Sequence, residues 1–106
     1  MRTVVDHYHA LPGLDTPAGR LHVRRTGAVL DGRVVQLTPA GLAVMRLLAE
    51  RNGAVVTRAE VLAALPGSSQ DNHAAEVAVS RLRESLRDPR VVRTVVKRGY
   101  CLDVAP

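Results

Sequence analysis

The sequence predicts a single α+β domain in which an antiparallel sheet comes first, three helices follow, and a β-hairpin closes the chain. Three observations carry this prediction. Asp31-Gly32 separates two short apolar runs, which is a strong hairpin signal because tight hairpin turns need positive φ. Between residues 38 and 87, three segments combine helix-start signals with apolar residues at helical spacing. After Asp88-Pro89, short β-branched runs lead to a second hairpin with its tip at Lys97 to Gly99.

The sheet is expected over residues 20 to 37, where Leu21 and Val23 alternate with polar neighbours. Residues 1 to 19 are expected to be a lead segment or linker. Val4 and Val5 could begin a strand there, but the prolines and glycines that follow read as loop. The folded domain is therefore placed at residues 20 to 104.

The first two helices are each expected to begin after a threonine. Thr38 can accept a hydrogen bond from a free amide of the first turn, and Pro39 suits the first helical position. This helix is expected to end at Asn52-Gly53. The pair Thr57 and Glu60, three residues apart, has the pattern of a capping box, which predicts a second helix that stops at Pro66-Gly67.

The third helix is expected from about Asp71 or Asn72 to about Arg87. At ~100° per residue its apolar stripe and its outer side separate cleanly. The stripe comprises Ala75, Val79, Leu82 and Leu86. The outer side comprises His73, Val77, Ser80, Arg81 and Glu84, with Arg83 and Arg87 on its flanks. Two short helices, a third with a charged outer side and a terminal basic hairpin are typical of a helix-turn-helix variant with a wing.

Charge is concentrated near the end of the chain. The 106 residues carry a formal net charge of +5, from 15 basic and 10 acidic side chains. Seven bases and two acids lie between Arg81 and Tyr100, so this short stretch alone accounts for the net charge. A localised basic surface indicates a polyanionic partner.

Several function classes are not indicated. Cys101 is the single cysteine, which excludes an internal disulfide and fits a reducing, cytoplasmic setting. No apolar stretch approaches the ~18 residues of a membrane span, so no membrane partner is expected. His7, His9, His22 and Cys101 match no metal-ligand spacing. No catalytic arrangement appears either, so neither enzymatic activity nor a cofactor is expected.

Four segments, in this order and at these spacings, resemble the OmpR/PhoB family of winged-helix DNA-binding domains, the output domains of many two-component response regulators. The segments are Leu37–Pro39, Val56–Leu62, Val79–Arg83 and Arg93–Tyr100. The resemblance covers about residues 20 to 104. It implies a four-stranded N-terminal sheet, three helices and a C-terminal wing. It also implies double-stranded DNA as partner, with the third helix in the major groove and the wing at the adjacent minor groove.

Carried over position by position, the resemblance implies two sets of DNA contacts. Those facing base edges are Ala74, Val77, Ala78 and Arg81. Those meeting phosphate or the minor groove are Ser80, Arg83, Thr94, Lys97 and Arg98. His73, on the outer side of the helix, and Arg87, a flanking cation, complete the expected DNA-binding set. Arg81 is the candidate base reader, because arginine can donate two hydrogen bonds to guanine O6 and N7.

Two of these assignments keep an alternative. Arg81 could instead be a solvated arginine paired with Glu76 or Glu84. Val77 could contact a thymine methyl group, or it could pack against the wing or a neighbouring subunit. Gly99 is expected to permit the hairpin turn, and Tyr100 is expected to pack under the wing.

The resemblance also implies partners and a context. Family members usually bind direct repeats as head-to-tail pairs, and the loop before the third helix often contacts RNA polymerase. Here that loop, residues 68 to 71, is short, the second helix lacks the family's aromatic-Gly ending, and Ala74 and Ala78 replace longer polar side chains. The segments Ala64–Gly67 and Val95–Tyr100 look most like the version of this domain fused behind uroporphyrinogen-III synthase in some bacteria.

The sequence therefore predicts sequence-specific double-stranded DNA binding in transcriptional regulation. The 19 residues before the domain are too few for a receiver domain, which needs roughly a hundred more. The alternative is a winged-helix protein-interaction or regulatory module fused to an enzyme such as uroporphyrinogen-III synthase.

Overall fold

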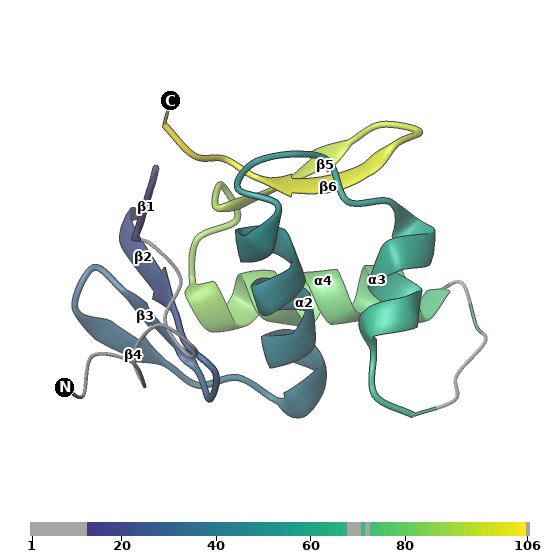
Figure 1. Ribbon diagram of the computed structural model, residues 1–106, viewed down its shortest axis with the longest axis horizontal. Helices are drawn as coiled ribbons and strands as arrows, with labels where there is room; N and C mark the ends of the chain where they lie inside the picture. Colours follow the sequence, from purple (N-terminus) through teal and green to yellow (C-terminus); the bar gives the residue numbers. More distant parts are fainter. Residues whose placement is uncertain (1–12, 68–70, 72, 106) are drawn as a thin grey trace, which may run out of the picture.

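The computed structural model describes residues 13–67, 71 and 73–105. A four-stranded sheet lies at one end, three helices form the centre, and a two-stranded hairpin lies across them (Figure 1). The sheet strands are β1 Leu14–Thr16, β2 Gly19–Val23, β3 Ala28–Leu30 and β4 Arg33–Val35. The helices are α2 Pro39–Glu50, α3 Arg58–Ala64 and α4 His73–Leu86. The hairpin strands are β5 Val92–Val95 and β6 Gly99–Leu102. The α+β prediction is confirmed.

The N-terminal sheet is an antiparallel meander in the order β1-β2-β3-β4. Leu30 of β3 pairs with Arg33 of β4, which leaves a two-residue turn at Asp31 and Gly32. Both turn residues have positive φ, 51° and 84°, as the primed hairpin turns require. The predicted hairpin is therefore confirmed.

The sheet begins earlier than the sequence indicated. Residues 14 to 16 form strand β1, and β2 already begins at Gly19. Leu14 of β1 pairs with Leu21, and Thr16 pairs with Gly19 across a turn that contains Pro17. The Thr16 hydroxyl donates to the Gly19 carbonyl at 2.7 Å. A strand of three residues is too short to show alternation, and the proline of its turn reads as loop. Val4 and Val5, the other strand candidate, lie outside the described residues.

The first two helices begin as predicted. Thr38 Oγ1 accepts from Gly41 N at 3.0 Å at the start of α2. At the start of α3, Thr57 Oγ1 accepts from Glu60 N at 3.1 Å, and Glu60 Oε1 accepts from Thr57 N at 3.0 Å, which completes the capping box. Hydrogen bonds from Arg51 and from Thr57 N lower the pKa of Glu60 to about 2.

The core is aliphatic, as a chain without Phe or Trp requires. Helix α4 lies behind α2 in Figure 1 and packs against it. Its whole predicted stripe is buried in the core. No polar or charged residue is buried among the described residues. The largest fully buried side chains come from both the sheet and the helices: Leu21, Met45, Leu48, Leu82, Leu86 and Leu102.

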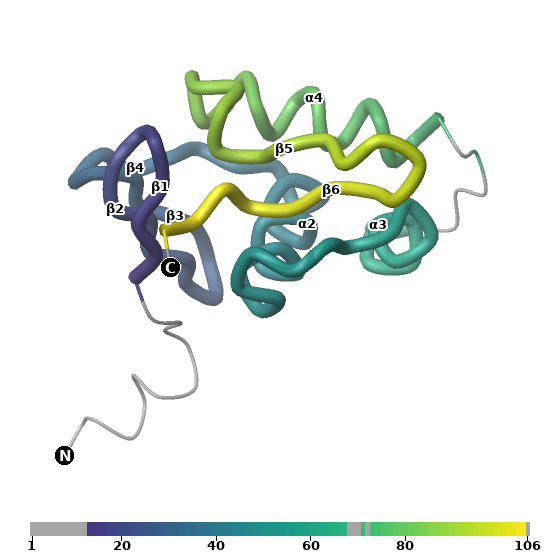
Figure 2. Tube along the Cα trace, turned by 90° about the horizontal axis from the view of Figure 1, so that it is seen from above, coloured from purple at the N-terminus to yellow at the C-terminus, as the bar shows by residue number. Residues whose placement is uncertain are grey.

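The hairpin is attached to the helices by the link between α2 and α3. Val56 N donates to Tyr100 O at 2.7 Å, and Tyr100 N donates to Val56 O at 2.8 Å. Figure 2 shows this link running beside β6. Val56 forms an isolated antiparallel bridge with Tyr100 of that strand. Tyr100 is 5% exposed, which confirms that it packs under the wing.

Gly99 is required at this junction. Its φ is +147°, and a Cβ atom here would lie 2.0 Å from Val56 O and 2.9 Å from Thr57 Cα. Backbone atoms cannot move away as a flexible side chain can. The sequence predicted that Gly99 permits the hairpin turn, whereas in the structure Gly99 begins β6 and a glycine is needed for the close approach of Val56.

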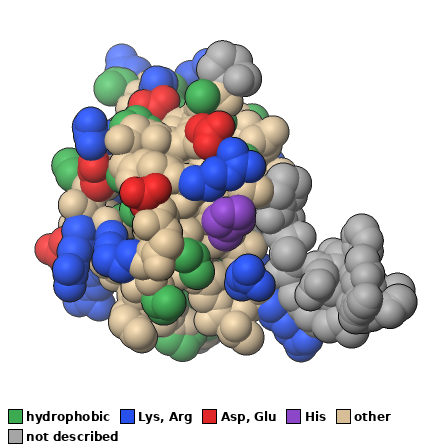
Figure 3. Space-filling model, turned by 90° about the vertical axis from the view of Figure 1, so that its left-hand side faces the viewer, with side chains coloured by type: hydrophobic (Ala, Val, Ile, Leu, Met, Phe, Trp, Pro, Cys, Tyr) green, Lys and Arg blue, Asp and Glu red, His purple; other side chains and the backbone are tan. Residues whose placement is uncertain are grey.

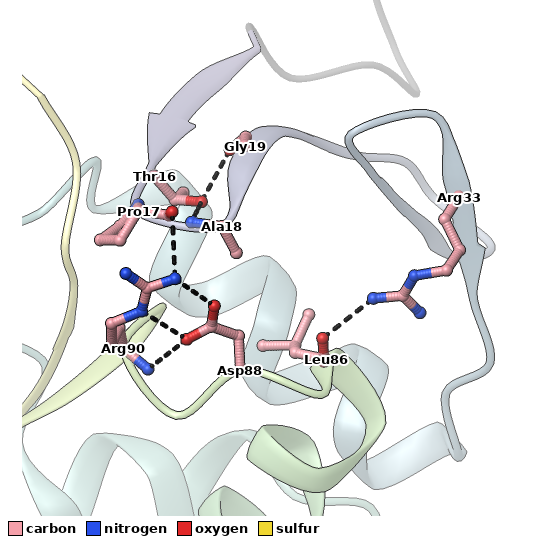
Figure 4. Close-up of polar contacts among 8 residues, drawn as sticks. All are labelled: Thr16, Pro17, Ala18, Gly19, Arg33, Leu86, Asp88 and Arg90. Carbon is pink, nitrogen blue, oxygen red and sulfur yellow. Dashed lines mark hydrogen bonds and ion pairs between the residues drawn. The ribbon is translucent and has the colours of Figure 1, made fainter.

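Polar contacts also join the end of α4 to the sheet (Figure 4). Arg33 Nη2 of β4 donates to Leu86 O at 2.9 Å. Arg90 Nε and Nη2 donate to the two oxygens of Asp88 at 2.9 and 2.7 Å, and Nη2 also reaches Pro17 O at 3.3 Å. The hydrogen bond from the Arg90 side chain lowers the pKa of Asp88 to about 2.

Replacing Gly99 with alanine should lower the free energy of unfolding by about 2 to 4 kcal/mol, because the methyl group meets backbone and the φ becomes strained. Urea unfolding followed by circular dichroism measures this change. Gly27→Ala is the matched control, since a Cβ there meets nothing within 4 Å; it should change stability by less than about 0.5 kcal/mol. Equal effects of the two variants would contradict the close-approach argument.

Replacing Asp88 with asparagine should change how stability depends on pH. The folded-state pKa of about 2 lies below the ordinary 3.8, so the contribution of Asp88 is lost as pH falls toward 2. Thermal melts from about pH 5 to pH 2 should therefore fall more steeply for the unmodified chain than for the variant. Parallel pH profiles would show that the Arg90 contact does not stabilise the fold.

Candidate nucleic-acid interface

The outer side of α4 is an exposed polar surface. It carries His73, Glu76, Ser80, Arg81, Glu84 and, just beyond the helix, Arg87. Arg81 occupies its centre and lines three neighbouring hollows of the surface, one toward β4, one toward α2 and α3, and one along α4 itself. Because α4 buries its opposite side in the core, this face is the one that α4 can present to a partner.

The guanidinium of Arg81 has no hydrogen-bond or ion-pair partner among the described residues. Glu76 pairs instead with Arg58 Nη2 at 3.2 Å and with His73 Nδ1 at 3.6 Å. Glu84 makes no ion pair in the described part of the chain. The donors of Arg81 are therefore available to a partner, and the alternative that it is paired with an acid does not describe this structure.

The small residues of α4 are placed differently from one another. Ala74 and Val77 are half-buried and line a hollow with Leu65 and Pro66 of the α3 end. Ala78 is 8% exposed and belongs to the core. Ala78 was expected to face base edges; it lines the same hollow as Ala74 and Val77, and most of its side chain packs in the core.

The hairpin turn comprises Val96, Lys97 and Arg98. The Arg98 amide donates to Val95 O at 2.9 Å, and Lys97 has a φ of 64°. Gly99 was expected in the tip but is the first residue of β6, paired with Val95. Val96 is 76% exposed, a tip residue that the charge pattern of the sequence did not single out.

Arg58 of α3 joins the cations of the hairpin. A hollow of about 230 Å³ lies between them, lined by Arg58, Thr94, Val95, Lys97, Arg98, Gly99 and Tyr100. Its basic members are far apart in the sequence and meet because Val56 holds the start of α3 against β6. Arg58 was not predicted as a site residue, and its position in a capping sequence carried no signal for one.

Arg83 connects α4 to the hairpin. Its Nε donates to Val92 O at 2.9 Å, and its Nη2 donates to Thr94 Oγ1 at 2.8 Å. Both Arg83 and Thr94 were expected to contact phosphate. The structure gives Arg83 a bridging position, with the exposed Thr94 hydroxyl as one of its acceptors.

The end of the molecule formed by the N-terminal sheet carries both basic and acidic side chains. Figure 3 shows the side of the N-terminal sheet, where basic and acidic side chains are interspersed. Ion pairs such as Arg20–Asp15, at 2.8 Å, neutralise part of this surface. The stretch from Arg81 to Tyr100, with seven bases and two acids, lies on α4 and the hairpin.

Other kinds of site are not apparent in the described part of the chain. No group of three or more His, Cys, Asp or Glu residues could hold a metal ion there, and His7 and His9 lie outside it. Cys101 is buried in β6. Within the same residues, no helix is long and apolar enough to cross a membrane.

Replacing Arg83 with alanine should loosen the hairpin, because two hydrogen bonds from a charged donor are lost. We expect the free energy of unfolding to fall by about 1 to 2 kcal/mol, less than for a fully buried pair. Amide hydrogen exchange of β5 should accelerate more than that of α2. Arg93→Ala is the control, because Arg93 lies on β5 between Val92 and Thr94 and has no side-chain hydrogen-bond partner among the described residues; an equal loss there would contradict the bridging role.

The chain matches known proteins over most of its length. The family model described as "Transcriptional regulatory protein, C terminal" matches residues 32–102. Response regulator protein PmrA of Pseudomonas aeruginosa is 38% identical over 96 residues, which cover 89% of this chain and 43% of that protein. Transcriptional regulatory protein CutR of Streptomyces coelicolor is 33% identical over 91 residues, which cover 84% of this chain and 42% of CutR. The chain thus spans less than half the length of these relatives, which are described as regulators.

Solved structures match the fold. The RstA DNA-binding domain of Klebsiella pneumoniae, in complex with the RstA box, has a TM-score of 0.69 at 26% identity and covers 88% of this chain and 98% of that one. The DNA-binding domain of Escherichia coli CpxR has a TM-score of 0.71 at 29% identity, covering 91% and 100%. DrrB of Thermotoga maritima, an OmpR/PhoB homologue, has a TM-score of 0.73 at 21% identity, covering 96% and 48%, and supports the fold alone. With three helices, an antiparallel sheet and a C-terminal wing, the chain belongs to the transcriptional regulatory protein C-terminal family, the OmpR/PhoB-type winged-helix domains of response regulators.

Proposed function

We propose that this domain binds double-stranded DNA sequence-specifically and acts in transcriptional regulation. The observation that carries the proposal is Arg81 at the centre of the outer side of α4, beside a basic hairpin and without an ion-pair partner in the described ranges of the chain. The family relation supports it, since the similar RstA domain was solved with its DNA box. The free side of α4 enters the major groove in this proposal, and the hairpin lies at the adjacent minor groove.

The two parts of the surface have different roles. Arg81 reads sequence, because its forked donors match the two acceptors of guanine in the major groove. Val77, half-exposed nearby, contacts a thymine methyl group, while His73 and Ser80 lie at the margins of the helix. Lys97 and Arg98 contact phosphates or the minor groove and supply affinity more than specificity.

The finer assignments concern partners. We expect head-to-tail pairs on direct repeats, and such contacts need two different patches on each copy. Val34 on β4 is 65% exposed and Val96 in the hairpin turn is 76% exposed. In this proposal each of them supplies an apolar residue to one of the two patches. Contact with RNA polymerase is assigned to the loop before α4, where residues 68–70 lie outside the described residues.

A second function is favoured by the small side chains of the interface. Ala74 and Val77 line a hollow with Leu65 and Pro66, and apolar side chains of this kind suit a protein partner. In this version the domain is a protein-interaction or regulatory module fused to an enzyme such as uroporphyrinogen-III synthase. The concentrated positive charge favours DNA over this alternative.

Replacing Arg81 with alanine tests the proposal. The unmodified chain and the variant are titrated against random and genomic duplexes, with single and tandem sites, at several salt concentrations. If about five cations contact phosphates, log K should fall with log salt at a slope of about −4 to −5. The variant should lose about 10-fold or more of its preference between sequences, because one bidentate contact provides ~1 to 3 kcal/mol of discrimination.

Arg24→Ala, which removes the same charge from the exposed turn between β2 and β3, is the matched control. It should leave the preference between sequences unchanged. A salt slope near zero, or an Arg81 variant with full sequence preference, would exclude this mode of DNA recognition. Cooperative binding restricted to tandem sites would support the head-to-tail arrangement.

A further inference from the structure

A second basic groove lies beside α4, on the side away from the basic side chains of the hairpin. Arg33 of β4, Arg81 of α4 and Arg87 after α4 line it, together with Val34, Gln36, Glu84 and Ser85. Its volume is about 360 Å³. Three arginines from two separate elements thus face one space, and Arg81 makes the groove continuous with the outer side of α4.

The side chain of Arg33 is held in position by a hydrogen bond to the main chain of α4. Its Nη2 donates to Leu86 O at 2.9 Å, as Figure 4 shows. A guanidinium has five N–H donors, and only this one bond is made to the described residues. The contact fixes the charge at the groove and leaves most of its donors for a ligand.

Arg87 occupies a conformation that arginine does not favour. Its φ is 62°, and its amide donates to Arg83 O and Glu84 O at 3.0 and 3.1 Å, which closes the helix. Glycine is the usual residue at such a helix end, because a side chain there is strained. A purely structural role would therefore favour glycine, whereas the exposed side chain of Arg87 contributes charge to the groove.

One acid opposes the three arginines. Glu84 lines the groove, but its carboxylate forms no ion pair with Arg33, Arg81 or Arg87. The lining therefore keeps an excess of positive charge. Since forked guanidinium donors match phosphate oxygens, a phosphodiester is the ligand that fits this lining.

We infer that this groove holds a backbone phosphate of DNA, beyond the base pairs that α4 contacts, and that Arg33 brings the N-terminal sheet into the DNA interface. The inference rests on the proposed DNA-binding function. It extends the cation set from the hairpin side of α4 to both sides. Basic side chains would then contact DNA phosphates on both sides of α4.

The test removes the groove arginines one at a time. Arg33→Gln and Arg87→Gly are titrated by fluorescence anisotropy against a random-sequence duplex of about 30 base pairs, from about 50 to 300 mM KCl. Each variant should bind several-fold more weakly at the lowest salt and reduce the salt slope by about one. Arg33→Lys, which keeps the charge, should restore the slope.

Stability separates a binding role from a structural one. Arg87→Gly should raise the thermal midpoint while it weakens DNA binding, because glycine relieves the positive φ. Glu84→Gln should strengthen binding, since it removes the one opposing carboxylate of the groove. Arg24→Gln, the same charge change on the turn between β2 and β3, should leave the salt slope within error of the unmodified chain.

Unchanged slopes for Arg33→Gln and Arg87→Gly, with normal binding by the unmodified chain, would overturn this inference and leave the proposed function standing. An equal loss in Arg24→Gln would also overturn it, because the effect would then come from net charge. If the unmodified chain shows no salt-dependent binding, the proposed function and the inference fail together.

Discussion

Two hydrogen bonds between Val56 and Tyr100 hold the C-terminal hairpin against the helices, and the rest of the functional surface depends on them. They form only because Gly99 lets the two backbones approach to a distance that a Cβ atom would prevent. Through this bridge the start of α3 comes to lie beside the hairpin turn, which brings Arg58 next to Lys97 and Arg98. The hairpin is thereby a fixed part of the domain, and its cations have a defined position relative to α4.

Helix α4 is joined to its surroundings by arginines whose roles differ with their contacts. Arg83 turns toward the hairpin and donates to Val92 and Thr94. Arg81, two residues earlier, has no partner in the described chain and faces outward. Arg33 reaches the last carbonyl of α4 from the sheet. Arg83 and Arg33 thus attach the C-terminal part of α4 to the hairpin and to the sheet. A helix held in this way presents Arg81 in a defined position, which suits the base-reading role proposed for it.

Local signals were sufficient for most of the fold. The caps at Thr38 and Thr57 and the positive-φ turn at Asp31-Gly32 involve residues within three positions of one another, so the sequence predicted them correctly. Strand β1 was missed because three residues show no period and its turn contains Pro17. The pairing of Val56 with β6 joins residues more than forty positions apart, and no local pattern encodes such a contact.

The sequence by itself determined the order of elements, the helix boundaries, the apolar stripe of α4 and the concentration of charge after Arg81. These follow from backbone preference and periodicity, which act over one or two turns of chain. Only the tertiary structure decided which side chains of the site have partners within the described part of the chain: there Arg81 has none and Arg83 is bonded to the hairpin. It also buries Ala78 and adds Arg58 and Arg33 from distant segments. Packing between elements sets these distances, and a charge is available to a partner only when no neighbour in the fold has already taken its hydrogen bonds.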